Sequence, residues 1–155
     1  MRLHSRDTGD LLMALVWPLQ KSGDAGLTVQ LVQYLLGAHD LRVPVDGAFG
    51  PRTAAAVRDF QTRHGLTPDG QVGQRTWPVL IVPVRSGSRG QAVHAVQDAS
   101  HTLDPQYQPK LALDGEFGPR TAAWVRHYQG VVHALVDGEV GPTTWNHLAK
   151  GDRAS

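Results

Sequence analysis

Residues 46–61 read DGAFGPRTAAAVRDFQ, and residues 114–129 read DGEFGPRTAAWVRHYQ. The two 16-residue stretches differ at only four positions and lie 68 residues apart. The same offset places DGQVGQRTW, residues 69–77, on DGEVGPTTW, residues 137–145. Self-similarity of this length is typical of a duplicated structural unit, so both copies are expected to share one fold.

The spacing of apolar and turn residues predicts three short helices in each copy. Val29, Val32 and Leu36 recur at helical spacing and form the apolar stripe of the first helix. The second helix begins at Pro51, because proline at the first helical position has no N–H to leave unpaired. Its inner face includes Phe60, and a tyrosine holds the equivalent place in the second copy.

Glycine and proline indicate where the helices begin and end. The third helix is expected to open at Gly73 and to be brief, because Pro78 lies about one turn inside it without a backbone donor. Gly65 is placed to end the second helix in a left-handed conformation. The second copy has His133 at that position and Gly130 earlier, so its helix either stops at Gly130 or His133 adopts a positive φ.

Composition and charge exclude several classes of protein. The 155 residues include 15 Lys+Arg and 14 Asp+Glu, a formal net charge of +1. This balance argues against a nucleic-acid partner bound by phosphate neutralisation. Cysteine is absent, which excludes disulfides, thiolate metal ligands and cysteine nucleophiles. No segment has the about 20 apolar residues of a membrane span, so none is expected.

The repeats divide the chain into four parts. Residues 1–14 are expected to form a leader or an N-terminal arm, and not a convincing signal peptide, because acidic residues stand in the would-be basic region. The first repeat spans residues 15–82, the second spans 83–150, and residues 151–155 form a tail. The short, partly apolar segment between the repeats favours two docked lobes over two flexibly linked ones.

The combined pattern V-x-x-V-Q, D-G-x-F-G-P-x-T and D-G-x-V-G-x-x-T-W resembles the bacterial peptidoglycan-binding domain of the three-helix type. Two copies cover about residues 17–148. The resemblance implies an all-α fold of two tandem three-helix lobes packed against each other. It also implies a non-catalytic role in holding a protein against peptidoglycan or a muropeptide, in the cell envelope or outside the cell. The lack of a convincing signal peptide keeps a cytoplasmic or particle-associated location as the alternative.

Most recurring residues have a structural explanation. Phe49 and Trp77, with their counterparts in the second copy, are expected in the core by spacing. The aspartate of each Asp-Gly pair forms a turn, and neither turn has the alternating oxygen ligands of a calcium loop. Gln33 and Gln61, repeated as Gln97 and Gln129, are expected to be buried amides that satisfy backbone groups of the loops.

Arg52 and Arg120 are the residues with the most specific binding hypothesis. They lie in the first turn of the second helix of each repeat. A guanidinium and the free N–H groups of a helix start both suit an anion such as the carboxylate of a wall stem peptide. Arg58 and Arg126 also recur, and surface charge is the default explanation for all four arginines.

Trp124 stands where the first copy has Ala56. The indole either fills space inside the lobe, some of it supplied by Ser100 in place of Leu36, or projects to a groove where an aromatic face suits a sugar or a partner. Its neighbour on the helix stripe is Tyr128. The candidate ligand-binding residues are therefore Arg52, Arg120, Trp124 and Tyr128.

No cofactor or metal is expected, because the eight histidines form no compact ligand set and are expected at the surface. No catalytic motif is present either. Three functions are considered. The first is a wall-binding protein that tethers itself or a partner, such as a separately encoded wall hydrolase or protein complex. The second is an adaptor of a phage-like, secretion or intracellular complex that reuses the fold. The third is an enzyme that uses the crevice between the lobes.

Overall fold

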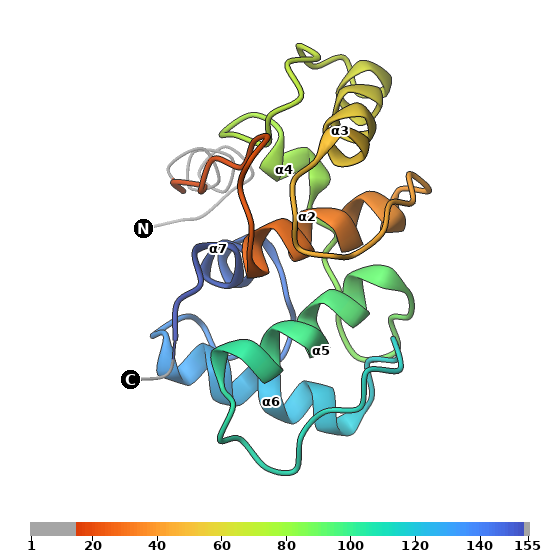
Figure 1. Cartoon of the computed structure of the whole chain (residues 1–155). Helices are drawn as coiled ribbons and strands as arrows, with labels where there is room; N and C mark the ends of the chain where they lie inside the picture. Colours follow the sequence, from red (N-terminus) through yellow and green to blue (C-terminus); the bar gives the residue numbers. More distant parts are fainter. Residues whose placement is uncertain (1–14, 154–155) are drawn as a thin grey trace, which may run out of the picture.

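The computed structural model describes residues 15–153, so the expected arm of residues 1–14 and the last two residues of the tail lie outside it. Over the described residues the chain is helical, with isolated bridges and no strands. Figure 1 shows three helices from each repeat, as the duplication predicts. They are α2 (Leu27–Ala38), α3 (Pro51–Arg63) and α4 (Trp77–Leu80), then α5 (Gln91–Leu103), α6 (Pro119–Val131) and α7 (Pro142–Lys150).

The end of α6 decides between the two alternatives for the second repeat. The helix continues past Gly130 to Val131. His133 follows with φ 61°, close to the φ of 70° at Gly65 in the first repeat. The chain therefore leaves both helices through the same left-handed residue, and histidine tolerates this conformation better than most side chains.

The third helix differs from the expectation in one repeat. It begins at Trp77 and not at Gly73, and it comprises only four residues. A helix that starts at Trp77 places Pro78 in its first turn, where a missing N–H costs nothing. The equivalent helix α7 has no internal proline and begins at Pro142, so it extends over nine residues.

Four buried glutamines hold the Asp-Gly turns, as predicted. Gln97 accepts the N–H of Gly115 at 2.9 Å. Its amide nitrogen donates to Asp114 Oδ1 at 3.0 Å, to the Glu116 carbonyl at 3.0 Å and to Thr121 Oγ1 at 3.2 Å. The same four kinds of contact recur at Gln33, Gln61 and Gln129, and each of the four residues is 1% exposed.

The aromatic residues predicted for the core are buried, and the two lobes use them in the same way. Trp77 donates its indole N–H to the Pro18 carbonyl at 2.7 Å, and Trp145 donates to the Val82 carbonyl at 2.8 Å. Pro18 precedes α2 and Val82 precedes α5, so the entry segment of the second lobe begins at least one residue before the predicted boundary at 83. Phe49 and Phe117 are buried with them. Each lobe thus ties its third helix to its own entry segment.

The lobes are docked through equivalent helices, α2 and α5, which lie side by side at the centre of Figure 1. Leu31 and Leu35 are buried on α2. The first helices of the two repeats align with an offset of 64 residues, which pairs Gln33 with Gln97, so the equivalent positions on α5 are the buried Ala95 and Ala99. Large side chains on one helix and small ones on the other allow the two helices to approach closely. Across the junction, Tyr34 donates to Asp98 at 2.8 Å.

Candidate functional site

A groove of about 470 Å³ lies beside Arg120 in the second repeat. It runs between the start of α6 and the segment that precedes the Asp-Gly turn. Lys110 and Arg120 bring positive charge to it, and Leu111 supplies an apolar wall. Asp114 and Glu116 line its other side. The groove therefore presents cationic and anionic groups to the same ligand.

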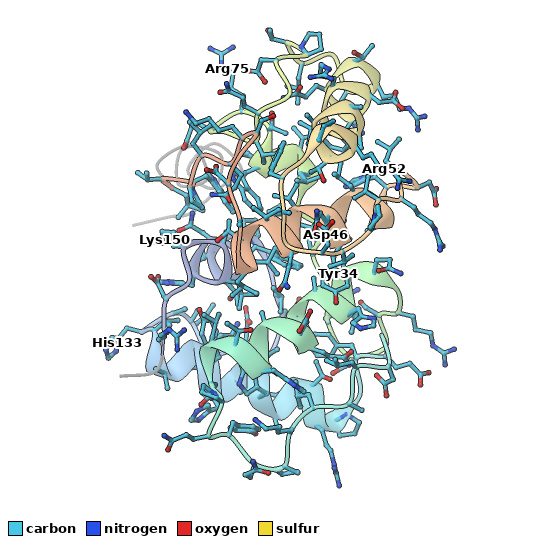
Figure 2. The ribbon with its side chains drawn as sticks, viewed as in Figure 1. Tyr34, Asp46, Arg52, Arg75, His133 and Lys150 are labelled. Carbon is cyan, nitrogen blue, oxygen red and sulfur yellow. The ribbon has the colours of Figure 1, made fainter. Side chains whose placement is uncertain are left out.

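A corresponding groove of about 420 Å³ lies beside Arg52 in the first repeat. The 68-residue offset places Arg42 on Lys110, Val43 on Leu111 and Arg52 on Arg120. Figure 2 shows Arg52 on the flank of the first lobe that also bears Asp46. Asp40 and Asp59 also line this groove, so each groove carries two cationic and two carboxylate side chains.

The backbone reinforces the charge of both arginines. Arg52 and Arg120 lie in the first turns of α3 and α6, whose amides have no acceptor within the helix. Neither helix start has a capping side chain or an acidic residue in its first turn. Among the described residues, neither arginine forms an ion pair with a carboxylate. An anionic group would find both a guanidinium and helix N–H groups there.

The carboxylate at the rim of the second groove is held in its ionised form by the fold. The backbone N–H of Glu116 and the amide of Gln97 both donate to Asp114, and these hydrogen bonds lower the pKa of its carboxyl. Asp46 has the same environment, and its pKa is lowered mainly by the N–H of Ala48 and then by Gln33. These aspartates hold turns, as predicted, and in the second repeat the turn also forms the edge of the groove.

Trp124 and Tyr128 lie in the interior and line neither groove. Each is 1% exposed, and their rings stack with centroids 4.9 Å apart. The indole N–H donates to Asp104 Oδ2 at 3.2 Å, and the Tyr128 hydroxyl donates to the Asp152 carbonyl at 2.7 Å. Burial, and then the nearby Asp152 carboxylate, raise the pKa of the Tyr128 hydroxyl. The interior alternative for Trp124 is therefore the observed one, and neither ring has a face open to a ligand.

Arg58 and Arg126 pack against the turns. A Cβ built at Gly70 would lie 3.0 Å from Arg58 Nη1, and one built at Gly138 would lie 3.0 Å from the Arg126 guanidinium. Both glycines also have positive φ, 75° and 77°. These arginines therefore cover the second turn of each repeat, which gives them a structural role beyond surface charge.

The prediction that the histidines lie at the surface is only partly right. His64, His127 and His133 are exposed, whereas the other histidines of the described range are half-buried. The ring of His101 bonds the Leu111 carbonyl at 2.8 Å, and His147 lies 2.7 Å from Asp152. Between residues 15 and 153, no group of three or more His, Asp or Glu side chains is arranged to hold a metal ion.

Sequence reasoning proposed Arg52 and Arg120, which the structure places beside the two grooves, but it missed two other basic residues of the grooves and Arg89, which lies between them. Arg42 and Lys110 could have been found, because the 68-residue offset pairs one basic residue with another beside the Asp-Gly turn. Arg89 left no comparable signal. It approaches Glu116 at 3.4 Å only because the entry segment of the second repeat bridges to its Asp-Gly turn.

Comparison with known proteins agrees with this architecture. The family model of the peptidoglycan binding domain matches residues 25–80 and 89–148. The chain therefore belongs to the peptidoglycan-binding domain family and carries two tandem copies of the domain. No helix within residues 15–153 is long and apolar enough to cross a membrane.

Two relatives with known descriptions are similar over most of the chain. The zinc D-Ala-D-Ala carboxypeptidase of Streptomyces albus G is 32% identical over 76% of this chain and 42% of its own length. The N-acetylmuramoyl-L-alanine amidase CwlL of Bacillus licheniformis is 28% identical over 90% of this chain and 45% of its own length. The chain thus spans less than half of each relative.

Among solved structures, the endolysin of the Burkholderia phage AP3 is 32% identical. It aligns with a TM-score of 0.42 over 56% of this chain and 33% of its own. A peptidoglycan-binding protein from Clostridioides difficile, in complex with glutamine hydroxamate, is 35% identical with a TM-score of 0.40. That alignment covers 41% of this chain and 40% of the other.

Proposed function

We propose that this chain is a non-catalytic peptidoglycan-binding protein that tethers itself, or a separately encoded partner, to the bacterial cell wall. The observation that carries the proposal is the arginine groove that both family repeats present in equivalent positions. A core alone explains the buried motif residues, but it does not explain why an exposed basic pair recurs near the first Asp-Gly turn of each repeat.

The ligand chemistry follows from the charges. Peptide stems of the wall carry free carboxylates, and a guanidinium at a helix start binds a carboxylate with two donors. In the second repeat, Asp114 and Glu116 offer acceptors to the amines and hydroxyls of the same ligand. The neighbouring Leu111 lines the groove but is only 3% exposed, so ligand recognition rests on the charged side chains. We assign the stem peptide, next to its sugar, to these grooves.

Sedimentation with purified sacculi tests the proposal. The double variant Arg52→Gln/Arg120→Gln removes the positive charge from both grooves. An exposed charged pair contributes up to about 1 kcal/mol, so each site should lose about fivefold in affinity. The matched control is Arg75→Gln/Arg153→Gln, which removes the same charge from exposed positions outside both grooves. Figure 2 shows Arg75 on the opposite flank from Arg52.

Three outcomes separate the candidate functions. Wild-type protein that sediments with sacculi at moderate salt, and a groove variant that does so less than the control, support wall binding through the arginines. Sacculi that retain no wild-type protein, with a stoichiometric protein partner in native extracts, would establish the adaptor function instead. Release of soluble muropeptides during the incubation would establish an enzyme.

A further inference from the structure

The two arginine grooves are connected by hollows that share lining residues. The Arg52 groove shares Arg42 with a hollow of about 450 Å³ between the lobes. This junction hollow shares Ser88 and Arg89 with a smaller one of about 330 Å³. The smaller one in turn shares Asp114, Glu116 and Gly118 with the Arg120 groove. Each hollow therefore adjoins the next, and we call the series of four hollows from repeat to repeat the track.

The fold places the whole track on one flank of the molecule. In Figure 1 the C-terminal end of α2, the N-terminal end of α5 and the N-terminal end of α6 follow one another along the right-hand side. The docking of α2 on α5 keeps these ends together. A Cβ built at Gly37 would lie 3.4 Å from Gln91 Cγ, so the backbone of the first lobe touches a side chain of the second lobe inside the track.

Charges of both signs recur along the track, where the carboxylates of Asp40, Asp59, Asp114 and Glu116 lie among the cations. Arg52 stands at one end, Arg42 and Arg89 stand at the junction, and Lys110 and Arg120 stand at the other end. Arg89 approaches Glu116 at 3.4 Å, but the two side chains are 79% and 57% exposed. An ion pair this exposed to water contributes little, so a ligand carboxylate can replace Glu116 at small cost.

We infer that the track holds one continuous glycan strand bearing several peptide stems, with the junction as a middle subsite between the Arg52 and Arg120 grooves. This inference rests on the proposed wall-binding function and adds the length of the ligand to it. Two independent sites would each bind a separate muropeptide, whereas a continuous track would bind a polymer more tightly than a single unit. A strand that reaches both grooves binds the second one at high effective concentration and therefore more tightly overall.

The test compares two soluble probes by calorimetric titration at one salt concentration. One probe is a single disaccharide–peptide, and the other is a fragment of several such units on one glycan strand. The wild-type protein should bind the fragment at least tenfold more tightly than the single unit, with one fragment per protein molecule. Arg89→Gln should lower this fragment-to-unit affinity ratio by up to about fivefold, because it removes an exposed charged contact made by the longer probe. Arg75→Gln, the charge-matched control outside the track, should leave the ratio unchanged.

Two results would overturn the track, and they differ from failure of wall binding itself. If the single unit binds and the fragment gains no affinity per site, with one fragment bound at each groove, the repeats are independent and the proposed function stands. If Arg89→Gln leaves the ratio unchanged while retaining the wild-type melting temperature, the junction is not a subsite. If neither probe nor sacculi bind wild-type protein, the proposed function and the track fall together.

Discussion

Replacing Gln97 by alanine tests whether the buried glutamines hold the fold together. The side chain makes four hydrogen bonds, to Gly115, Asp114, Glu116 and Thr121, at 2.9–3.2 Å. A net contribution of about 1 kcal/mol per hydrogen bond predicts that Gln97→Ala lowers the free energy of unfolding by about 3–4 kcal/mol. The lower figure is favoured because the exposed Asp114 carboxylate can bond to water in the variant. A lobe of this size has little stability to spare, so a loss of this magnitude is large.

Urea unfolding followed by tryptophan fluorescence measures this cost. The matched control is Gln106→Ala, an exposed glutamine of the same lobe, which should change the free energy of unfolding by less than about 0.5 kcal/mol. If the free energy of unfolding of Gln97→Ala lies within about 1 kcal/mol of the wild-type value, the reasoning is refuted, because the turn would then be stable without the Gln97 amide.

A second variant keeps the test valid if Gln97→Ala does not fold. Gln97→Glu keeps the acceptor for the Gly115 N–H but places a carboxyl against Asp114. The neighbouring negative charge raises the pKa of the introduced carboxyl in the folded state. Stability of this variant should therefore increase as the pH falls toward about 4, because protonation restores a donor. A melting temperature with the same pH profile as wild type would contradict the assigned contact.

Three further predictions concern other parts of the fold. Trp145→Ala removes a fully buried indole and its hydrogen bond, so urea unfolding should show a loss of about 3–5 kcal/mol. Gly70→Ala should lower the free energy of unfolding by about 1–2 kcal/mol, because φ is 75° and the new Cβ meets Arg58. Arg58→Ala removes only the clash with Arg58, so full recovery of the melting temperature in the double variant would contradict a cost from the backbone. Asp46→Asn/Asp114→Asn should flatten the fall of melting temperature below about pH 4. The lowered pKa of both aspartates provides stability above their unfolded pKa that is lost as the pH falls through the folded pKa.

Part of the candidate site could be predicted from the sequence because it belongs to the repeated unit. The Gly-Pro-Arg start of the second helix recurs without change, which places Arg52 and Arg120 in equivalent first turns. The same periodicity could not decide whether Trp124 lies inside or outside. Its place depends on the segment after α5, where Asp104 accepts the indole N–H, and that segment is four residues longer than the equivalent segment after α2.

The sequence by itself determined the duplication, the three helices of each repeat and the buried glutamines, because helical periodicity and turn chemistry act over a few residues. Only the tertiary structure decided how the two lobes meet. Helix α2 buries a second apolar row, Leu31 and Leu35. The spacing of the apolar residues shows that two faces of this helix are covered, but it does not show which element covers the second face. The complementary row of Ala95 and Ala99 lies on α5, far along the chain. Pairing of such rows depends on shape and on the packing of the whole chain, so the track that crosses the junction is a property of the folded molecule.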